Sequence, residues 1–407
     1  MPTGARLKGD TLKLEVYKRG VCIMYSMFSY KIDIMKVIIR ELIKRLLFSY
    51  HSFCLKRSYK KLLAINFLPN KKQTGEVCWV DKWSVLGEKV NPIYYRLFSH
   101  YIGCDVNILP EDISHDVIES ILNPRRYEAY YSDKNVFDRL FPDGYLPQTI
   151  LRKMNGFYYT VDYIKVDLNM ESLYQFLKER KKVMIKPSVD SSSGKGIHLL
   201  YKDNGTWFIQ DTNEILDVSW LEHYGDNFII QECIEQHSYI SQFNATSVNT
   251  LRMTLYRSVK TDEPVILNCI MRIGAKGSIV DNAHAGGCFV GIDVESGKLQ
   301  HKVFNQWGQS WQRFNDIDFT DDYEIPNWDK IIDFAKSISF YVMHHRLIAL
   351  DLVLNKEGKP CLIEFNIRYY SCWLFQFTTG TALGMYTDEI IDYCVAHKKD
   401  REYLLKI

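Results

Sequence analysis

Two acidic residues interrupt an otherwise apolar stretch near the carboxyl end of this 407-residue chain. Residues 350–354 and 361–365 are apolar except for Asp351 and Glu364, and residues 355–360 between them have the composition of a tight turn. The pattern predicts a β-hairpin that carries acids where a core strand ordinarily has none.

The register of this hairpin decides whether its polar side chains meet. A tight turn in which Lys356 faces Lys359 places Asp351 directly opposite Glu364. Because side chains alternate along a strand, Asn366 shares the face of Glu364. Two close carboxylates repel each other unless a cation lies between them, and Mg²⁺ favours such oxygen ligands together with substrate phosphates. We therefore expect a magnesium site; the alternative is an exposed hairpin face with solvated acids.

A glycine- and serine-rich loop follows another apolar strand, which ends at Lys186. The loop, residues 188–196, reads SVDSSSGKG and leads into a further strand at residues 197–201. It matches neither a Walker phosphate loop nor a dinucleotide fingerprint, because both of those lead into a helix. Its backbone N–H groups, its hydroxyl groups and Lys195 suit a polyphosphate, at which Lys186 would also point. The alternative is a flexible turn.

Two arginines lie in a second strand pair, residues 248–257 and 264–273. If this hairpin turns near Asp262, Arg252 lies opposite Arg272. Paired arginines on a strand face are costly unless an anion neutralises them, and a phosphate, an acyl phosphate or a carboxylate would serve. The alternative is that each arginine pairs with one of the 49 acids of the chain.

The composition is that of a globular protein long enough for two or three domains. Hydrophobic residues make up 46% and charged residues 25% of the chain, and a net charge of +2 argues against a surface devoted to nucleic acid. The ten cysteines form no CxxC pair, which indicates reduced thiols rather than disulfides or a zinc site. No apolar run is long enough to span a bilayer, so we expect a cytoplasmic protein.

The amino-terminal part of the chain is basic. Residues 36–72 contain ten Lys and Arg against one acid, Glu41, and their apolar residues recur at helical spacing. These helices would meet anionic lipid or a lipid-linked substrate at the inner membrane face, or would present a solvated face. We expect short strands and helices in residues 75–123. Four parts are expected: a dispensable extension over 1–34, a basic helical and mixed domain over 35–131, and two lobes over 132–245 and 246–407.

The order of these motifs resembles the ATP-grasp superfamily. The resemblance rests on Lys186 before the loop, on QECI at residues 231–234, and on Asp351 followed by EFN at residues 364–366. GKG at 194–196, VNTLR at 248–252 and Asn282 before the glycines at 286–287 narrow it to the sugar-transfer-associated group, which is linked to capsule and surface-polysaccharide loci. The resemblance covers residues 132–384. It implies an α+β fold in which two lobes clasp ATP, after a helical and mixed amino-terminal region.

The resemblance also implies roles for individual residues. Asp351, Glu364 and Asn366 match the Mg²⁺ ligands, and Arg252 and Arg272 are the candidates to hold the transferred phosphoryl group. The residues implied to bind ATP are Lys134, Lys186, Ser191, Ser192, Ser193, Gly194, Lys195, Gly196, Gln231, Glu232, Cys233, Ile234 and Asn282. Many ATP-grasp ligases have an arginine two residues before the first metal acid; here that residue is Ala349, so Arg252 or Arg272 must supply the charge.

The implied chemistry is the joining of a carboxylate to an amine through an acyl phosphate, at the expense of ATP. We expect a ligase that modifies a sugar or sugar precursor of a capsule or O-antigen, with a lipid-linked glycan or a glycosyltransferase as partner. His284, His237 or a carboxylate would be the base, and Glu235 would bind the ribose. The alternatives are an ATP-grasp kinase and a catalytically weak ATP-binding partner of a glycosyltransferase.

Overall fold

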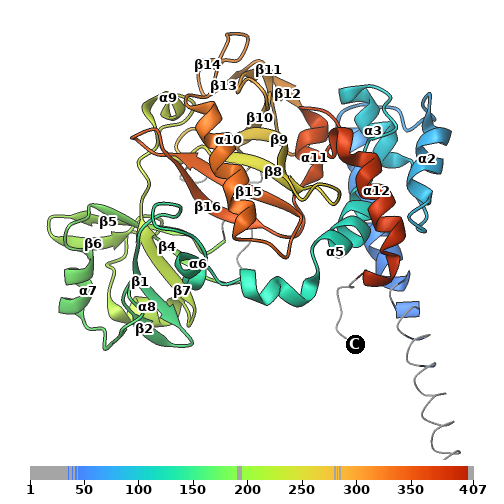
Figure 1. Cartoon of the computed structure of the whole chain (residues 1–407). Coiled ribbons are helices and arrows are strands. Elements are labelled where there is room, and N and C mark those ends of the chain that lie inside the picture. Colours follow the sequence, from blue (N-terminus) through green and yellow to red (C-terminus); the bar gives the residue numbers. More distant parts are fainter. Residues whose placement is uncertain are drawn as a thin grey trace, which may run out of the picture. The chain divides into compact units, whose positions relative to one another are not determined.

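The computed structural model describes Met35, Ile39 and residues 42–43, 45–189, 195–278, 281, 283 and 286–401 (Figure 1). The chain divides by its internal contacts into two compact units. One contains the described residues up to Leu55, and the other runs from Lys56 to the end of the described part. The expected extension over residues 1–34 lies outside the described residues, and the four expected domain boundaries stay predictions.

The amino-terminal region is helical. Its elements are a helix at residues 45–65, α2 (Glu76–Ser84), α3 (Ile93–Ile102), α4 (Glu111–Ile113), the π-helix η1 (Ser114–Ile118) and α5 (Glu119–Leu122). The expectation of short strands in residues 75–123 was wrong, since the structure describes none there. The aromatic run of α3 is rich in strand formers, but burial of Tyr94, Leu97 and Phe98 on one face of a helix outweighs that preference.

A first antiparallel sheet follows, with the strand order β3-β2-β1-β7-β4-β5-β6. Its strands are β1 (Thr149–Met154), β2 (Phe157–Tyr159), β3 (Lys165–Val166), β4 (Lys182–Pro187), β5 (His198–Asp203), β6 (Thr206–Ile209) and β7 (Phe228–Glu232). Helices α7 (Met170–Leu177) and α8 (Val218–Tyr224) pack against it around Val183, Ile185 and Phe228. We call this part the small lobe. Short helices precede it: η2 (Arg125–Tyr131), η3 (Lys134–Val136) and α6 (Phe137–Leu140).

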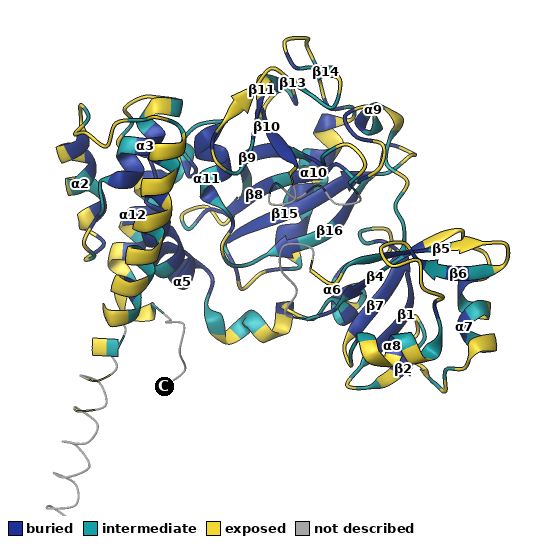
Figure 2. Ribbon diagram, turned by 180° about the vertical axis from the view of Figure 1, so that it is seen from behind, coloured by how far each residue is buried: buried dark blue, intermediate teal, exposed yellow. Residues whose placement is uncertain are grey.

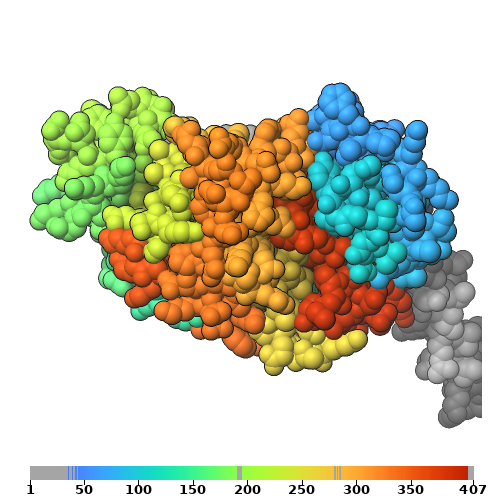
Figure 3. Space-filling model, turned by 90° about the horizontal axis from the view of Figure 1, so that it is seen from above, coloured from blue at the N-terminus to red at the C-terminus, as the bar shows by residue number. Residues whose placement is uncertain are grey.

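A second antiparallel sheet forms the large lobe, with the strand order β12-β11-β10-β9-β8-β15-β16. Its strands are β8 (Leu251–Arg257), β9 (Pro264–Ile273), β10 (Cys288–Ile292), β11 (Leu299–Phe304), β12 (Ser310–Trp311), β15 (Leu347–Leu354) and β16 (Pro360–Asn366), with a separate pair β13 (Arg313–Phe314) and β14 (Ile317–Asp318). In Figure 3 the small lobe, in green, lies beside this yellow and orange lobe.

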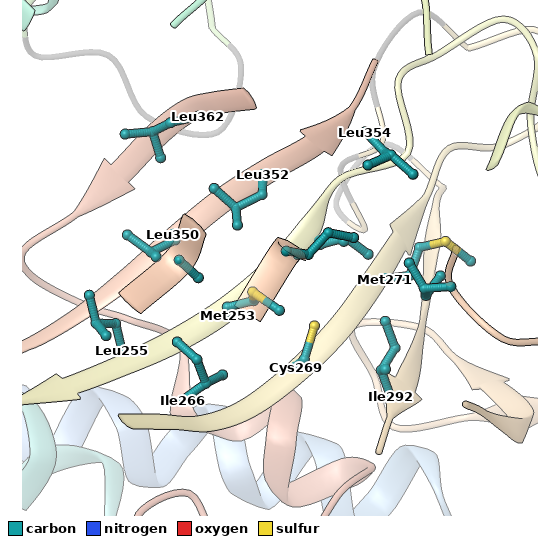
Figure 4. Close-up of a cluster of buried hydrophobic side chains, with 14 of the residues drawn as sticks. Met253, Leu255, Ile266, Cys269, Met271, Ile292, Leu350, Leu352, Leu354 and Leu362 are labelled. Carbon is teal, nitrogen blue, oxygen red and sulfur yellow. The ribbon is translucent and has the colours of Figure 1, made fainter. Parts of the chain in front are cut away.

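The core of the large lobe lies between its sheet and helix α10 (Trp328–Ser337). Figure 4 shows side chains of β8, β9 and β15, among them Met253, Met271 and Leu352, gathered on one side of the strands. Because side chains alternate along a strand, the other side of β8 and β15 is left for Arg252 and Asp351. In Figure 2 the central strands are buried, whereas α12 (Thr387–Ala396) exposes one face.

The remaining elements are short. They are α9 (Ser238–Ser241), η5 (Ile338–Phe340), α11 (Cys372–Phe377), η6 (Gly384–Tyr386) and η7 (Lys398–Asp400). None of the helices that the structure describes has both the length and the apolarity needed to cross a bilayer.

Candidate active site

Strands β15 and β16 place Asp351 directly opposite Glu364, as the sequence predicts. The turn differs from the expected one, because the Asn355 N–H donates to the Lys359 carbonyl oxygen at 2.9 Å. A turn of that size would shift the pairing by one residue, but a β-bulge at Ile363 in β16 restores it. The predicted pairing is therefore correct, although the predicted turn is wrong.

Asp351 is buried between two arginines. The Arg252 Nε atom lies 2.5 Å from one carboxylate oxygen of Asp351, and the Arg252 Nη2 atom lies 2.8 Å from the other. Arg272 Nη1 approaches the same carboxylate at 3.5 Å. Burial by itself would raise the pKa of Asp351, but the two guanidinium groups lower it below its ordinary value. Asp351 is consequently held as a carboxylate.

The predicted pairing of the two arginines was wrong. Arg252 lies opposite Ile270, and the Arg272 N–H donates to the Thr250 carbonyl oxygen at 2.8 Å. The strands pair from Arg257 and Pro264 and contain a bulge beyond Thr254, so the register differs from that of a tight turn near Asp262. Both arginines still reach Asp351, because positions two apart share a sheet face.

A second acid that the sequence analysis missed lies beside Arg272. Asp281 is buried, and one of its oxygens lies 2.9 Å from Arg272 Nη2. Its other oxygen accepts hydrogen bonds from the Thr250 N–H and hydroxyl groups. Burial lowers the pKa of Arg272, but Asp281 and Asp351 raise it above its ordinary value. The signal in the sequence was the expected cost of paired arginines, whose neutralising anions are these two buried aspartates.

Two lysines approach the acids from the small-lobe side. Lys134 lies in η3, where the Asp133 side chain accepts a hydrogen bond from the Asn135 N–H. The Lys134 N–H donates to the Ser188 carbonyl oxygen just after β4, and its Nζ atom lies 2.9 Å from Glu364 Oε1. Glu364 is thereby linked to the small lobe.

Lys186 in β4 is buried in a different electrostatic setting. Its ammonium group makes no hydrogen bond or ion pair with any residue in the described part of the chain. Burial and the neighbouring Lys134 lower the pKa of Lys186 to about 8, against an opposing effect of Glu364. A buried cation without a direct partner is costly, and an anionic ligand would compensate it.

These side chains border a cavity between the two sheets. Its lining combines a set of apolar residues with a set of polar and charged ones. The apolar residues are Pro147, Met184, Ile197, Cys233, Ile234, Val248 and Ile363, and the polar ones are Lys186, Gln231, Glu232, Thr250, Arg272, Asp281, Asp351 and Glu364. A flat heterocycle suits the first set and a polyphosphate the second.

The structure brings together most of the predicted site residues. Lys186, Arg272, Asp351, Glu364 and the four residues at positions 231–234 line the cavity, and Lys134 and Arg252 contact its acids. Lys195 and Gly196 are exposed and lie outside the lining. Ser191, Ser192, Ser193, Gly194 and Asn282 lie outside the described residues.

Three residues expected to act as the base or to bind the ribose gain no support from the geometry. The His237 side chain accepts a hydrogen bond from the Tyr239 N–H at the start of α9, and His284 lies outside the described residues. Glu235 is exposed and pairs with Lys356 at 2.9 Å rather than lining the cavity. The base and the ribose ligand therefore stay predictions without a structural argument.

The sequence matches the family described as sugar-transfer associated ATP-grasp over residues 114–390, which is more than half of the chain. The chain belongs to this family. The expected α+β ATP-grasp fold, with a helical amino-terminal region, is confirmed. None of the curated proteins matches the sequence.

Solved structures resemble the chain at a distance. The ATP-grasp ligase PsnB, complexed with a phosphomimetic variant of its minimal precursor, Mg and ADP, has 12% identity and a TM-score of 0.37 over 67% of this chain and 61% of that one. The D-cycloserine synthetase DcsG has 11% identity and a TM-score of 0.39, over 68% and 73%. The D-alanine-D-alanine ligase from Coxiella burnetii has 10% identity and a TM-score of 0.37, over 68% and 62%. The chain thus spans about three-fifths of the PsnB chain that it matches.

The residues of the cavity fit the ligands that the family implies. Lys186 offers a phosphate a buried charge that makes no hydrogen bond or ion pair within the described part of the chain, and Asn366, two residues after Glu364 in β16, is close enough to Asp351 to lower its pKa. Among the described residues no group of three or more His, Cys, Asp or Glu side chains suits a metal. A magnesium site here would rest on two acids, one carboxamide and phosphate oxygens, which is the donor set that Mg²⁺ accepts.

Proposed function

We propose that this ATP-grasp protein is an ATP- and Mg²⁺-dependent ligase that joins a carboxylate to an amine through an acyl phosphate. The observation that carries the proposal is the juxtaposition of Lys186, without a direct partner, with the Asp351–Glu364 pair along one cavity. A cation and two acids beside the apolar lining of one cavity suit a nucleoside triphosphate and its metal.

In the proposed site, Lys134 and Lys186 hold the phosphates of ATP. Residues 231–234, at the end of β7 and just after it, contact the adenine. Asp351, Glu364 and Asn366 hold Mg²⁺, which when bound neutralises phosphate charge. Arg252 and Arg272 pair with Asp351, so their guanidinium groups lie beside a proposed metal ligand and would also neutralise the transferred phosphoryl group. They would supply the positive charge that Ala349 lacks.

The proposed reaction has two steps. A substrate carboxylate oxygen attacks the γ-phosphorus, the bond from this phosphorus to the bridging oxygen breaks, and ADP leaves. An amine nitrogen then attacks the acyl carbon, the carbon–oxygen bond to phosphate breaks, and inorganic phosphate leaves while the amine proton passes to a base. The protein contributes positioning and charge neutralisation rather than a covalent intermediate.

The family description supports a sugar or sugar precursor as the acceptor, and within that class we propose a uronic acid of a capsule or O-antigen precursor in the cytoplasm. Two other functions use the same cavity. A kinase would perform the first phosphoryl transfer alone, and an ATP-binding partner of a glycosyltransferase would bind nucleotide with little turnover. The opposed carboxylates of Asp351 and Glu364 in the cavity favour an enzyme, because nucleotide binding alone does not need them.

The test is ADP and phosphate release from Mg·ATP across a matrix of sugar acids and amines. We expect both products only when an acid and an amine are present together. ADP formed with a single acceptor and without free phosphate would instead show a kinase. Tight nucleotide binding without turnover across the matrix would support the binding partner. AMP and pyrophosphate as products would contradict the proposed chemistry altogether.

A further inference from the structure

One face of the amino-terminal helix exposes large apolar side chains. Six of these residues, all helical, belong to the compact unit that ends at Leu55, and each is 47% to 70% exposed. They are Met35, Ile39, Leu42, Leu46, Tyr50 and Phe53. Large apolar side chains exposed singly are ordinary, whereas a continuous row of them is typical of a binding surface.

The spacing of the six residues places them in one row. They follow each other at intervals of three or four residues, which at 3.6 residues per turn keeps them within an arc of roughly 80°. Phe48, in the helix at residues 45–65, is buried, so this helix has one buried side and one exposed apolar side. We call the six residues the exposed apolar row.

The charge around this row narrows the choice of partner. Residues 36–55, which belong to the same compact unit as the row, contain four Lys and Arg and only Glu41 as an acid, and Arg45 is exposed beside Leu46. A second copy of the helix would bring two strongly basic segments together, and the acids that pair helices in coiled coils are lacking. An anionic lipid surface would attract the same charge and accept the apolar side chains.

We propose that the exposed apolar row binds the surface of an anionic bilayer, with the helix lying in the plane of the lipid headgroups. Leu46 and Phe53 would enter the boundary between headgroups and acyl chains, and Tyr50 would keep its hydroxyl group among the headgroups. The basic residues of the segment would contact the lipid phosphates. This proposal does not depend on the ATP-dependent reaction, because its residues belong to a different compact unit from the cavity.

The experiment is flotation of the full-length protein with phosphatidylcholine vesicles that contain or lack phosphatidylglycerol. We expect binding to the anionic vesicles only, and a decrease at high salt because the lipid charge is screened. The variant Leu46→Ser/Tyr50→Ser/Phe53→Ser should bind the anionic vesicles about tenfold more weakly or worse, since it lacks three of the apolar side chains that would enter the bilayer. ATP turnover by the same variant should be unchanged.

A matched control substitutes three exposed apolar residues elsewhere, Phe340→Ser/Met343→Ser/Met385→Ser, and should bind vesicles as the wild type does. Equal binding by both triple variants, or no binding by the wild type, would overturn the proposal. So would a solution dimer that the Leu46, Tyr50 and Phe53 substitutions dissociate, in a protein that does not bind vesicles. Both variants change exposed residues, and far-ultraviolet circular dichroism would verify that they fold.

Discussion

Two clusters of buried charge differ in how completely their members are paired. In the first, His115 of the π-helix η1 lies 2.6 Å from Glu119 and 3.3 Å from Glu111. The other Glu111 oxygen accepts a hydrogen bond from the Tyr59 hydroxyl at 2.5 Å, and the other Glu119 oxygen accepts one from the Tyr369 N–H at 2.6 Å. We call this histidine cluster closed, because each of its three charged groups has a partner within the protein.

The second cluster is the set of charged side chains that line the cavity. Asp351 is paired as completely as Glu119. Lys186, in contrast, is buried beside another lysine and makes no hydrogen bond or ion pair in the described part of the chain. The pKa values show the same difference. Burial lowers the pKa of His115, but Glu119 and Glu111 raise it to about 10, whereas burial and Lys134 lower the pKa of Lys186 to about 8.

The comparison teaches how buried charge separates stability from binding. Removing a partner from the closed cluster leaves a buried charge without compensation, so it costs folding free energy. Removing Lys186 relieves such a cost, so it should affect ligand binding instead. Four predictions follow from this contrast, from the largest expected effect to the smallest.

Glu364→Gln should abolish ATP turnover, with a loss of about 1000-fold or more, because a metal ligand and its charge are removed. The free energy of unfolding should change by less than about 1 kcal/mol, since the carboxylate is partly exposed and its Lys134 pair lies near the surface. Steady-state ADP release and urea unfolding would measure the two quantities. Full activity in this variant would contradict the metal assignment.

Glu119→Ala should lower the free energy of unfolding by about 3 kcal/mol, because the buried His115 loses its partner at 2.6 Å and the Tyr369 N–H loses its acceptor. At temperatures where the variant is folded, its affinity for ADP should match that of the wild type. Urea unfolding and calorimetric titration would test this pair of outcomes. A destabilisation below about 1 kcal/mol would show that the contacts of Glu119 with His115 and Tyr369 contribute little to stability.

Lys186→Ala should weaken ADP and ATP binding by roughly 30-fold, as expected for the loss of one buried phosphate contact, without destabilising the protein. Lys186→Arg, which keeps the charge, serves as the control and should lose less. The measurement is calorimetric titration with each nucleotide. An unchanged dissociation constant for Lys186→Ala would remove this lysine from the site.

The pH dependence of nucleotide binding should show the same lysine. The Lys186 ammonium is charged below its pKa of about 8 and neutral above it, so nucleotide affinity should fall as the pH rises through that value. We expect a decrease of several-fold that Lys186→Arg abolishes, because a guanidinium group stays charged throughout. An affinity in the wild type that is constant over this interval would show that the charge of Lys186 does not contribute.

The local features of the site could be predicted from the sequence. Alternation and the turn residues along 350–366 predict the hairpin that carries Asp351 and Glu364, although their exact pairing depends on the bulge at Ile363, and a single strand suffices to place Lys186 near the end of β4. The order of these motifs also predicted the family and its fold. Each of these inferences uses contacts between residues close in sequence.

Only the tertiary structure decided which charges meet. The contacts of Arg252 and Arg272 with Asp351 depend on the bulge between β8 and β9 and on the pairing of β8 with β15, about 100 residues apart, which no local pattern encodes. Asp281 was missed for the same reason. Glu111, His115 and Glu119 follow one another at intervals of four residues, so only their burial together depends on tertiary packing. Alternation and turn chemistry act between neighbours in the chain, whereas the balance of buried charge is set by long-range packing.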